Sequence, residues 1–92
     1  MNCTLANIIQ WDDLIGAESY DWQLLNGAAG TVLASGNVTA SEVSCLEVFD
    51  EQVNGSFNFQ VRGVRGEFEG AWSDLLPLSF LLFGAPTGLT VV

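Results

Sequence analysis

Phe57-Asn58-Phe59-Gln60-Val61-Arg62 is the stretch that decides the fold of this 92-residue chain. Its apolar side chains alternate with polar ones, and a period of two places the two kinds on opposite faces of a β-strand. Arg65-Gly66-Glu67 then supplies a turn. Similar runs recur along the chain, separated by turn residues at roughly 8–12-residue intervals, which is typical of an all-β fold of two packed sheets.

The other alternating or β-rich runs complete the expected set of strands. They cover residues 4–11, 19–25, 31–34, 41–48 and 72–83, with a last strand-like run at 89–92. Asn26-Gly27 and Ser35-Gly36-Asn37 are expected turns between them. No stretch has a convincing helical period, so we predict one all-β domain with a single core.

The composition argues against several classes of function. The net charge is −9, with two Arg, no Lys and no His. Such a surface repels phosphate groups, so we expect neither nucleic-acid nor membrane-surface binding. Without His or Lys the common general bases and Schiff-base nucleophiles are missing, and we predict that the protein is not an enzyme. The most apolar run, residues 75–83, contains Pro77 and Ser79 and is much shorter than the roughly 20 residues of a membrane helix.

Four segments resemble a fibronectin type III domain. Residues 10–11 with 16–22 are similar to the passage from strand B to strand C of that family, residues 57–64 to its strand F, and residues 70–73 to the start of its strand G. Residues 85–91, Ala-Pro-Thr-Gly-Leu-Thr-Val, resemble strand A, which opens those domains but stands last here. The resemblance implies an immunoglobulin-like antiparallel β-sandwich of about seven strands, with the strand A equivalent at the C-terminal end.

On this reading residues 1–83 form strands B to G, and residues 84–92 form a strand A-like tail. In the family, strands A and G run in the same direction, so a tail that fills its own A position must first return by roughly 26 Å. The connection at residues 81–85 spans at most roughly 17 Å. We therefore expect the tail to pair in trans with strand B of another molecule. The alternatives are a tandem array cut at an arbitrary boundary and a frayed tail, while Met1 favours a self-standing protein.

The two cysteines are expected to be free thiols. In the type III topology Cys45 lies near the middle of strand E and opposes a residue around position 7 of strand B, whereas Cys3 falls at or before the start of strand B. Four residues of offset correspond to roughly 13 Å, beyond the roughly 7 Å that a disulfide can bridge. Free thiols would suit a reducing cytoplasm.

The acidic residues provide the one candidate metal site. The resemblance implies that the B–C and F–G loops meet at one pole, which would gather Asp12, Asp13, Glu67 and Glu69. Carboxylates that converge from two loops are the hard oxygen ligands that calcium takes, although their spacing matches no known calcium loop. The alternative is a solvated acidic rim, and no other cofactor is expected. Arg65-Gly66-Glu67 stands where some family members carry an integrin-binding Arg-Gly-Asp, and we interpret it as a turn.

Several apolar residues are expected to lie exposed and to form an interface with another protein. Phe68 lies between two glutamates of the F–G loop, and a second group lies at or beyond the expected end of strand G. These predicted interface residues are Phe68, Leu81, Leu82, Phe83, Pro86, Leu89, Val91 and Val92.

These patterns favour a non-catalytic structural or binding module whose partners are copies of itself or other subunits of a particle or array. The leading hypothesis is a small virion protein, such as a decoration, tail or fibre component of a tailed phage, assembled in the host cytoplasm through its C-terminal strand. The alternative is an adhesion or receptor module of an extracellular fibronectin type III array. Both rest in part on fold-level analogy.

Overall fold

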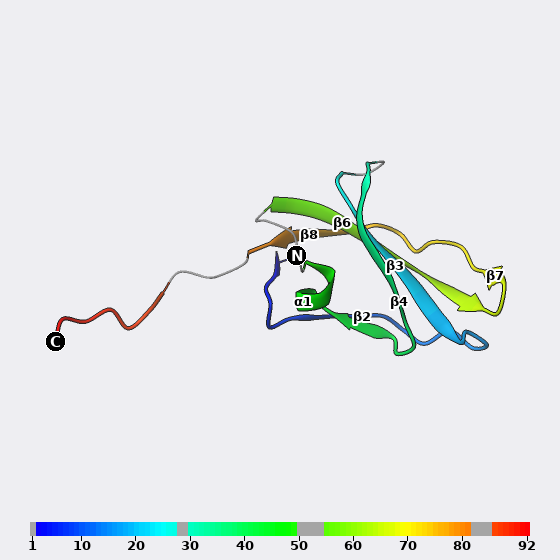
Figure 1. Cartoon of the computed structure of the whole chain (residues 1–92), viewed down its shortest axis with the longest axis horizontal. Coiled ribbons are helices and arrows are strands. Elements are labelled where there is room, and N and C mark those ends of the chain that lie inside the picture. The colour runs from blue at the N-terminus through cyan, green and yellow to red at the C-terminus, as the bar shows by residue number, and fades with distance from the viewer. Residues whose placement is uncertain (1, 28–29, 50–54, 82–85) are drawn as a thin grey trace.

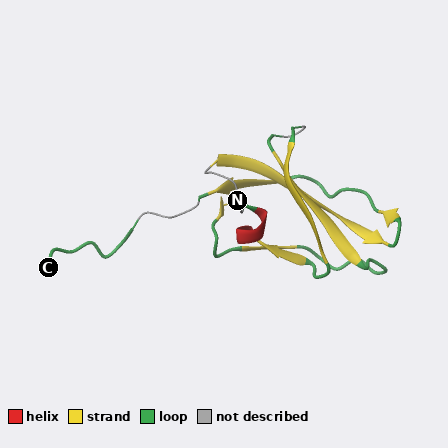
Figure 2. Cartoon of the chain, viewed as in Figure 1, coloured by secondary structure: helices red, strands yellow, loops and turns green. Residues whose placement is uncertain are grey.

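A computed structural model describes residues 2–27, 30–49, 55–81 and 86–92. The fold is all-β, and the described residues contain a single helix of four residues (Figures 1 and 2). The elements are β1 Asn2–Cys3, β2 Ile8–Gln10, β3 Ser19–Leu25, β4 Val32–Val38, β5 Glu42–Ser44, α1 Cys45–Val48, β6 Gly55–Arg65, β7 Phe68–Glu69 and β8 Leu76–Phe80.

The larger sheet is built around β6. Its strand order is β1-β8-β6-β3-β4, and β7 pairs with the C-terminal end of β6. The β3–β6 pair is antiparallel and runs from Ser19 opposite Val64 to Leu25 opposite Asn58. All pairs are antiparallel except that of β1 with β8. The alternating stretch from Phe57 to Arg62 is therefore a central strand, as its pattern predicts.

The smaller sheet consists of β2 and β5, which pair antiparallel over three positions. The hydrophobic core lies between the two sheets, because its buried side chains come from both. They are Cys3, Ile9, Trp22, Leu24, Val43, Cys45, Val48, Phe49, Phe59, Leu78 and Phe80. On β3 the alternation is as expected, since Tyr20, Trp22 and Leu24 are all buried.

Two local predictions were wrong. Residues 41–48 do not form one strand, because Ser44 caps α1: its Oγ accepts the Glu47 N–H, and the chain turns inward to bury Cys45, Val48 and Phe49. The expected turn at residues 35–37 lies instead within β4. Gly36 opposes Trp22, and a Cβ at this glycine would lie 2.7 Å from the indole Nε1. Gly36 thus leaves room for a large core side chain.

The expectation of two free thiols was also wrong, since Cys3 and Cys45 form a disulfide with their Cα atoms 6.4 Å apart. Cys45 does face position 7, because its N–H donates to the Asn7 carbonyl over 2.9 Å. However, the chain turns between Thr4 and Asn7, where the Asn7 N–H donates to the Thr4 carbonyl. Cys3 therefore does not continue the line of β2. It crosses to the larger sheet, where β1 pairs in parallel with β8, and so comes within reach of Cys45.

The C-terminal residues 86–92 form no strand and lie exposed. In Figure 1 this segment, coloured orange to red, runs away from the two sheets. Leu82 and Phe83 lie outside the described residues, as do the expected chain division at 83/84 and the connection before Pro86. Among the described helical residues, none belong to a helix that is long and apolar enough to cross a membrane.

We predict that the disulfide contributes a large share of the stability. The two cysteines are 42 residues apart in the sequence, so reduction opens a loop of that length. Loss of a native disulfide from a small domain lowers the free energy of unfolding by about 2–5 kcal/mol. Urea unfolding followed by tryptophan fluorescence, with and without a reductant, measures the difference. A Cys3→Ser/Cys45→Ser variant serves as the control and should not respond to the reductant. Equal urea midpoints for the oxidised and reduced chains would contradict the prediction.

Candidate functional site

Two loops meet at the end of the molecule where β7 lies. Residues 12–18 lie in the connection between β2 and β3, and residues 65–69 form the tip of the β6–β7 hairpin. Two hydrogen bonds join them: Arg65 Nη1 donates to the Gly16 carbonyl over 3.3 Å, and the Gly66 N–H donates to Glu18 Oε1 over 2.7 Å. We call these residues the loop pole. The fibronectin type III resemblance implied that these two loops meet.

Glycines shape both halves of the loop pole. Gly66 has a φ of +58° in the two-residue turn between β6 and β7, a conformation that favours glycine. Gly63 is buried on β6, and a Cβ there would lie 3.1 Å from Leu14 Cδ1 and 3.4 Å from the Ala17 Cβ. The absence of a side chain at position 63 therefore allows residues 14–17 to pack closely on β6.

Tyr20 holds the loop of residues 12–18 in place through its hydroxyl group. Its ring is buried and packs edge-on against Trp11 with the ring centres 5.5 Å apart, and its hydroxyl oxygen accepts the Leu14 N–H over 2.9 Å. The alternation within residues 19–25 predicts that Tyr20 is buried, but it does not indicate this second role. The only sequence signal for the hydrogen bond to Leu14 is the position of Tyr20, which lies six residues after Leu14 and near the start of a strand.

Arg62 fixes the second loop through a polar network on the outer face of the larger sheet. Its Nε and Nη2 each lie 3.1 Å from Asp21 Oδ2, and Nη2 also lies 3.0 Å from Glu69 Oε2. The guanidinium carbon lies 4.4 Å from the centre of the Trp72 ring, at the distance of a cation–π contact. One half-buried cation thus joins β3, β6, β7 and the segment that leads into β8.

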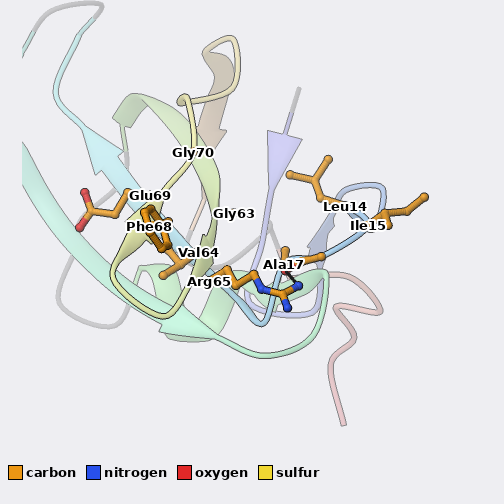
Figure 3. Close-up of a pocket in the computed structure, with 10 residues that line it drawn as sticks. Leu14, Ile15, Ala17, Gly63, Val64, Arg65, Phe68, Glu69 and Gly70 are labelled. Atoms are coloured by element: carbon orange, nitrogen blue, oxygen red, sulfur yellow. Dashed lines mark hydrogen bonds between the residues drawn. The ribbon is translucent and has the colours of Figure 1, made fainter.

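The loop pole presents apolar side chains to solvent. Leu14, Ile15 and Phe68 are 56%, 108% and 81% exposed. They come from both loops and border a shallow hollow of about 280 Å³, whose floor includes Gly63 and Val64 (Figure 3). The hydrogen bonds and the ion pair of Tyr20, Glu18, Arg65 and Arg62 hold the backbone that bears these side chains, so the apolar surface has a defined shape.

The carboxylates predicted to bind calcium are arranged differently from that expectation. Asp12, Asp13, Glu67 and Glu69 are all exposed, and Glu69 is paired with Arg62. Within the described ranges, no three acidic, His or Cys side chains gather as a metal ion would require. The prediction of calcium binding at these four residues therefore rests on the sequence alone.

The predicted interface residues fall into two separate groups. Phe68 belongs to the loop pole, whereas the others that the structure describes are Leu81, Pro86, Leu89, Val91 and Val92. Leu81 follows β8 and is 44% exposed, and Leu89, Val91 and Val92 are almost fully exposed. The two groups thus lie at opposite ends of the fold, with β7 at one end and the tail leaving from the other (Figure 1).

Comparisons of the chain with protein-family models, curated proteins and solved structures found no match. The fibronectin type III resemblance therefore stays a prediction from the residues that carry it.

We predict that Tyr20→Phe loosens the first loop. The variant keeps the buried ring but leaves the Leu14 N–H without its acceptor, which lowers the free energy of unfolding by about 0.5–1.5 kcal/mol. Amide hydrogen exchange should become faster at Leu14. Exchange at Gly66, whose N–H donates to Glu18, is the internal control and should stay unchanged. Unchanged exchange at Leu14 would show that the tyrosine hydroxyl does not hold the loop.

A calcium titration tests the predicted metal site. Because Glu69 is already paired with Arg62 and no three carboxylates gather in the described part of the chain, we expect millimolar calcium to change Tm no more than sodium chloride of equal ionic strength. Ligand binding to the folded state alone would raise Tm. A calcium-specific rise that Glu69→Gln abolishes would contradict this expectation and assign the site.

Proposed function

We propose that the protein is a non-catalytic structural module that functions by binding other proteins, first of all copies of itself. The loop pole carries this proposal, because three large apolar side chains stand exposed there on a backbone held by side-chain hydrogen bonds and an ion pair. Exposed aromatic and aliphatic side chains around a hollow are characteristic of protein contact surfaces. The absence of His and Lys from the whole chain also supports a non-catalytic function.

We further propose that the two sheets form an immunoglobulin-like sandwich of the fibronectin type III kind. The antiparallel β2–β5 pair corresponds to strands B and E of that family, and the neighbours β8, β6 and β3 correspond to G, F and C. The core between the sheets and the meeting of the B–C and F–G loops support the same assignment.

Two settings suit such a module. The exposed apolar tail supports a virion protein of a tailed phage that assembles through its C-terminal strand. The Cys3–Cys45 disulfide favours the second setting, an adhesion or receptor module of an extracellular array, because disulfides form and persist in oxidising compartments. In both settings the protein contacts other subunits rather than nucleic acid or membrane.

Sedimentation velocity of the oxidised chain, from about 1 µM to about 1 mM, tests the proposed function. We expect association that grows with concentration. Phe68→Ser should weaken it about tenfold or more, because truncation of a central aromatic contact costs more than 1 kcal/mol. Leu46→Ser is the matched control, since Leu46 is a similarly apolar residue, 54% exposed, on α1. A chain that stays monomeric throughout, or an equal effect of Leu46→Ser, would contradict the proposal.

A further inference from the structure

The smaller sheet has an open edge along β2. Asn7 and Trp11 turn their backbone groups toward β5, where the Asn7 carbonyl accepts from Cys45 and the Trp11 N–H donates to Ser41. In an antiparallel pair these directions alternate, so Ile8 and Gln10 turn their N–H and C=O groups away from β5. Among the described residues no strand pairs with that side of β2. Unpaired backbone groups of this kind are a template for another strand.

A second opening lies beside the same strand, between the two sheets. A hollow of about 240 Å³ separates Trp11, at the end of β2, from Ala71 and Ser73, which precede β8. Tyr20 and Val61 contribute to its lining, as do the charged residues Asp12 and Arg62. The indole Nε1 of Trp11 is buried and has no hydrogen-bond partner within the described residues, and a buried donor is normally paired. The core is therefore incompletely covered on this side.

The C-terminal tail has the pattern of the strand that this edge lacks. Leu89 and Val91 alternate with Thr90, so an extended backbone places the two apolar side chains on one face and the threonine on the other. Both apolar side chains are more than nine-tenths exposed. Residues 84–92 contain no charged side chain, so the segment adds no repulsion when it approaches a chain of net charge −9.

We propose that residues 89–92 of one copy pair antiparallel with β2 of a second copy, with Thr90 opposite Gln10 and Val92 opposite Ile8. The backbone groups of Thr90 and Val92 then bond to those that Gln10 and Ile8 leave open. Leu89 and Val91 fall opposite Trp11 and Ile9, on the core side, and Leu89 covers the hollow. This inference rests on the proposed self-assembly and adds to the loop pole a second contact surface with a defined register.

The side chains select this register and direction. A shift by one residue would turn Thr90 toward the core and Leu89 toward solvent. A parallel strand could also place Leu89 and Val91 inward, but Val92 would then fall beside Asp12. In the antiparallel register Val92 covers Ile8, an apolar side chain that is 53% exposed. On the outward face the apolar side chains of Val92 and Ile8 then lie next to each other, and so do the polar side chains of Thr90 and Gln10.

The position of the C-terminal end of β8 favours a second copy over the same chain. The Leu81 N–H donates to the Cys3 carbonyl, and Cys3 is bonded to Cys45, which faces Asn7. The chain thus leaves the sheet at the Asn7 end of β2, while Leu89 is required at the Trp11 end. The seven intervening residues would have to run the full length of the strand and then reverse. The tail of a neighbour that approaches from the loop pole needs no reversal.

The test uses the full oxidised chain and two variants. Leu89→Thr/Thr90→Leu keeps the composition of the tail but reverses its alternation. Gln10→Pro removes an outward N–H that makes no bond to β5, and Gln10→Ala is its control. We expect both the tail exchange and the proline to reduce association at least tenfold. The alanine keeps the backbone N–H and loses only the side-chain contact with Thr90, so it should reduce association much less than the proline does. Amide exchange at Ile8 and Gln10 should slow as the concentration of the unmodified chain rises.

A mixture of isotope-labelled and unlabelled chains shows whether the tail pairs with β2 of a second copy or with β2 of its own chain. Nuclear Overhauser effects between Gln10 of one chain and Thr90 of another are expected. Contacts within one chain, with protection that does not depend on concentration, would overturn the second-copy assignment. Association that survives the tail exchange would overturn the inference and leave the proposed function standing. Absence of association in the unmodified chain would overturn both.

Discussion

The disulfide between Cys3 and Cys45 is the constraint on which the arrangement of the two sheets depends. The smaller sheet has two strands and three paired positions, and a two-stranded sheet of this size is at best marginally stable alone. The bond ties its end to β1, which is paired with β8 of the larger sheet. Around it Phe49 stacks on Phe80 with ring centres 4.2 Å apart. The core that separates the sheets is therefore closed covalently at one end.

The elements that the sequence predicted well are those whose pattern is local. The alternation on β3 and β6 identifies both strands and their buried faces, and Arg65-Gly66-Glu67 marks the hairpin turn. The disulfide was missed because its formation depends on a turn at residues 4–7, which moves Cys3 from the line of one sheet into the other. Gly36 was predicted to be a turn residue. Its actual role is to leave room for Trp22, and that role exists only once β3 and β4 are paired.

The same distinction applies to the candidate site. The meeting of the two loops is what the fibronectin type III resemblance implies, and the exposed position of Phe68 follows from its place between two glutamates of a loop. The Arg62 network does not, because it requires that Arg62 lie opposite Asp21 and that Glu69 lie near both. Alternation places Asp21 and Arg62 on outward faces, but only the cross-strand register brings them together. That pairing occupies Glu69, a carboxylate that the sequence alone would leave free for a metal ion.

Several sheet edges lack a neighbouring strand in the described part of the chain, and the surroundings of two of them, β2 and β4, differ in a way that bears on assembly. In the larger sheet the edge strands are β4 and the two-residue β1, and in the smaller sheet β2 and β5 each have one open side. Beside β4 the hollow is lined by polar side chains, including Asp21, Asn37 and Arg62, and these already bond to one another. Beside β2 the hollow is bordered mostly by apolar residues such as Trp11, Tyr20 and Val61, together with Asp12 and Arg62. Each hollow is also lined by a tryptophan, Trp11 or Trp22, whose buried indole N–H has no partner within the described residues. An apolar strand would be buried against mainly apolar neighbours at β2 but would have to displace bonded polar groups at β4. The chemistry of the two edges therefore directs an uncharged apolar tail to the smaller sheet.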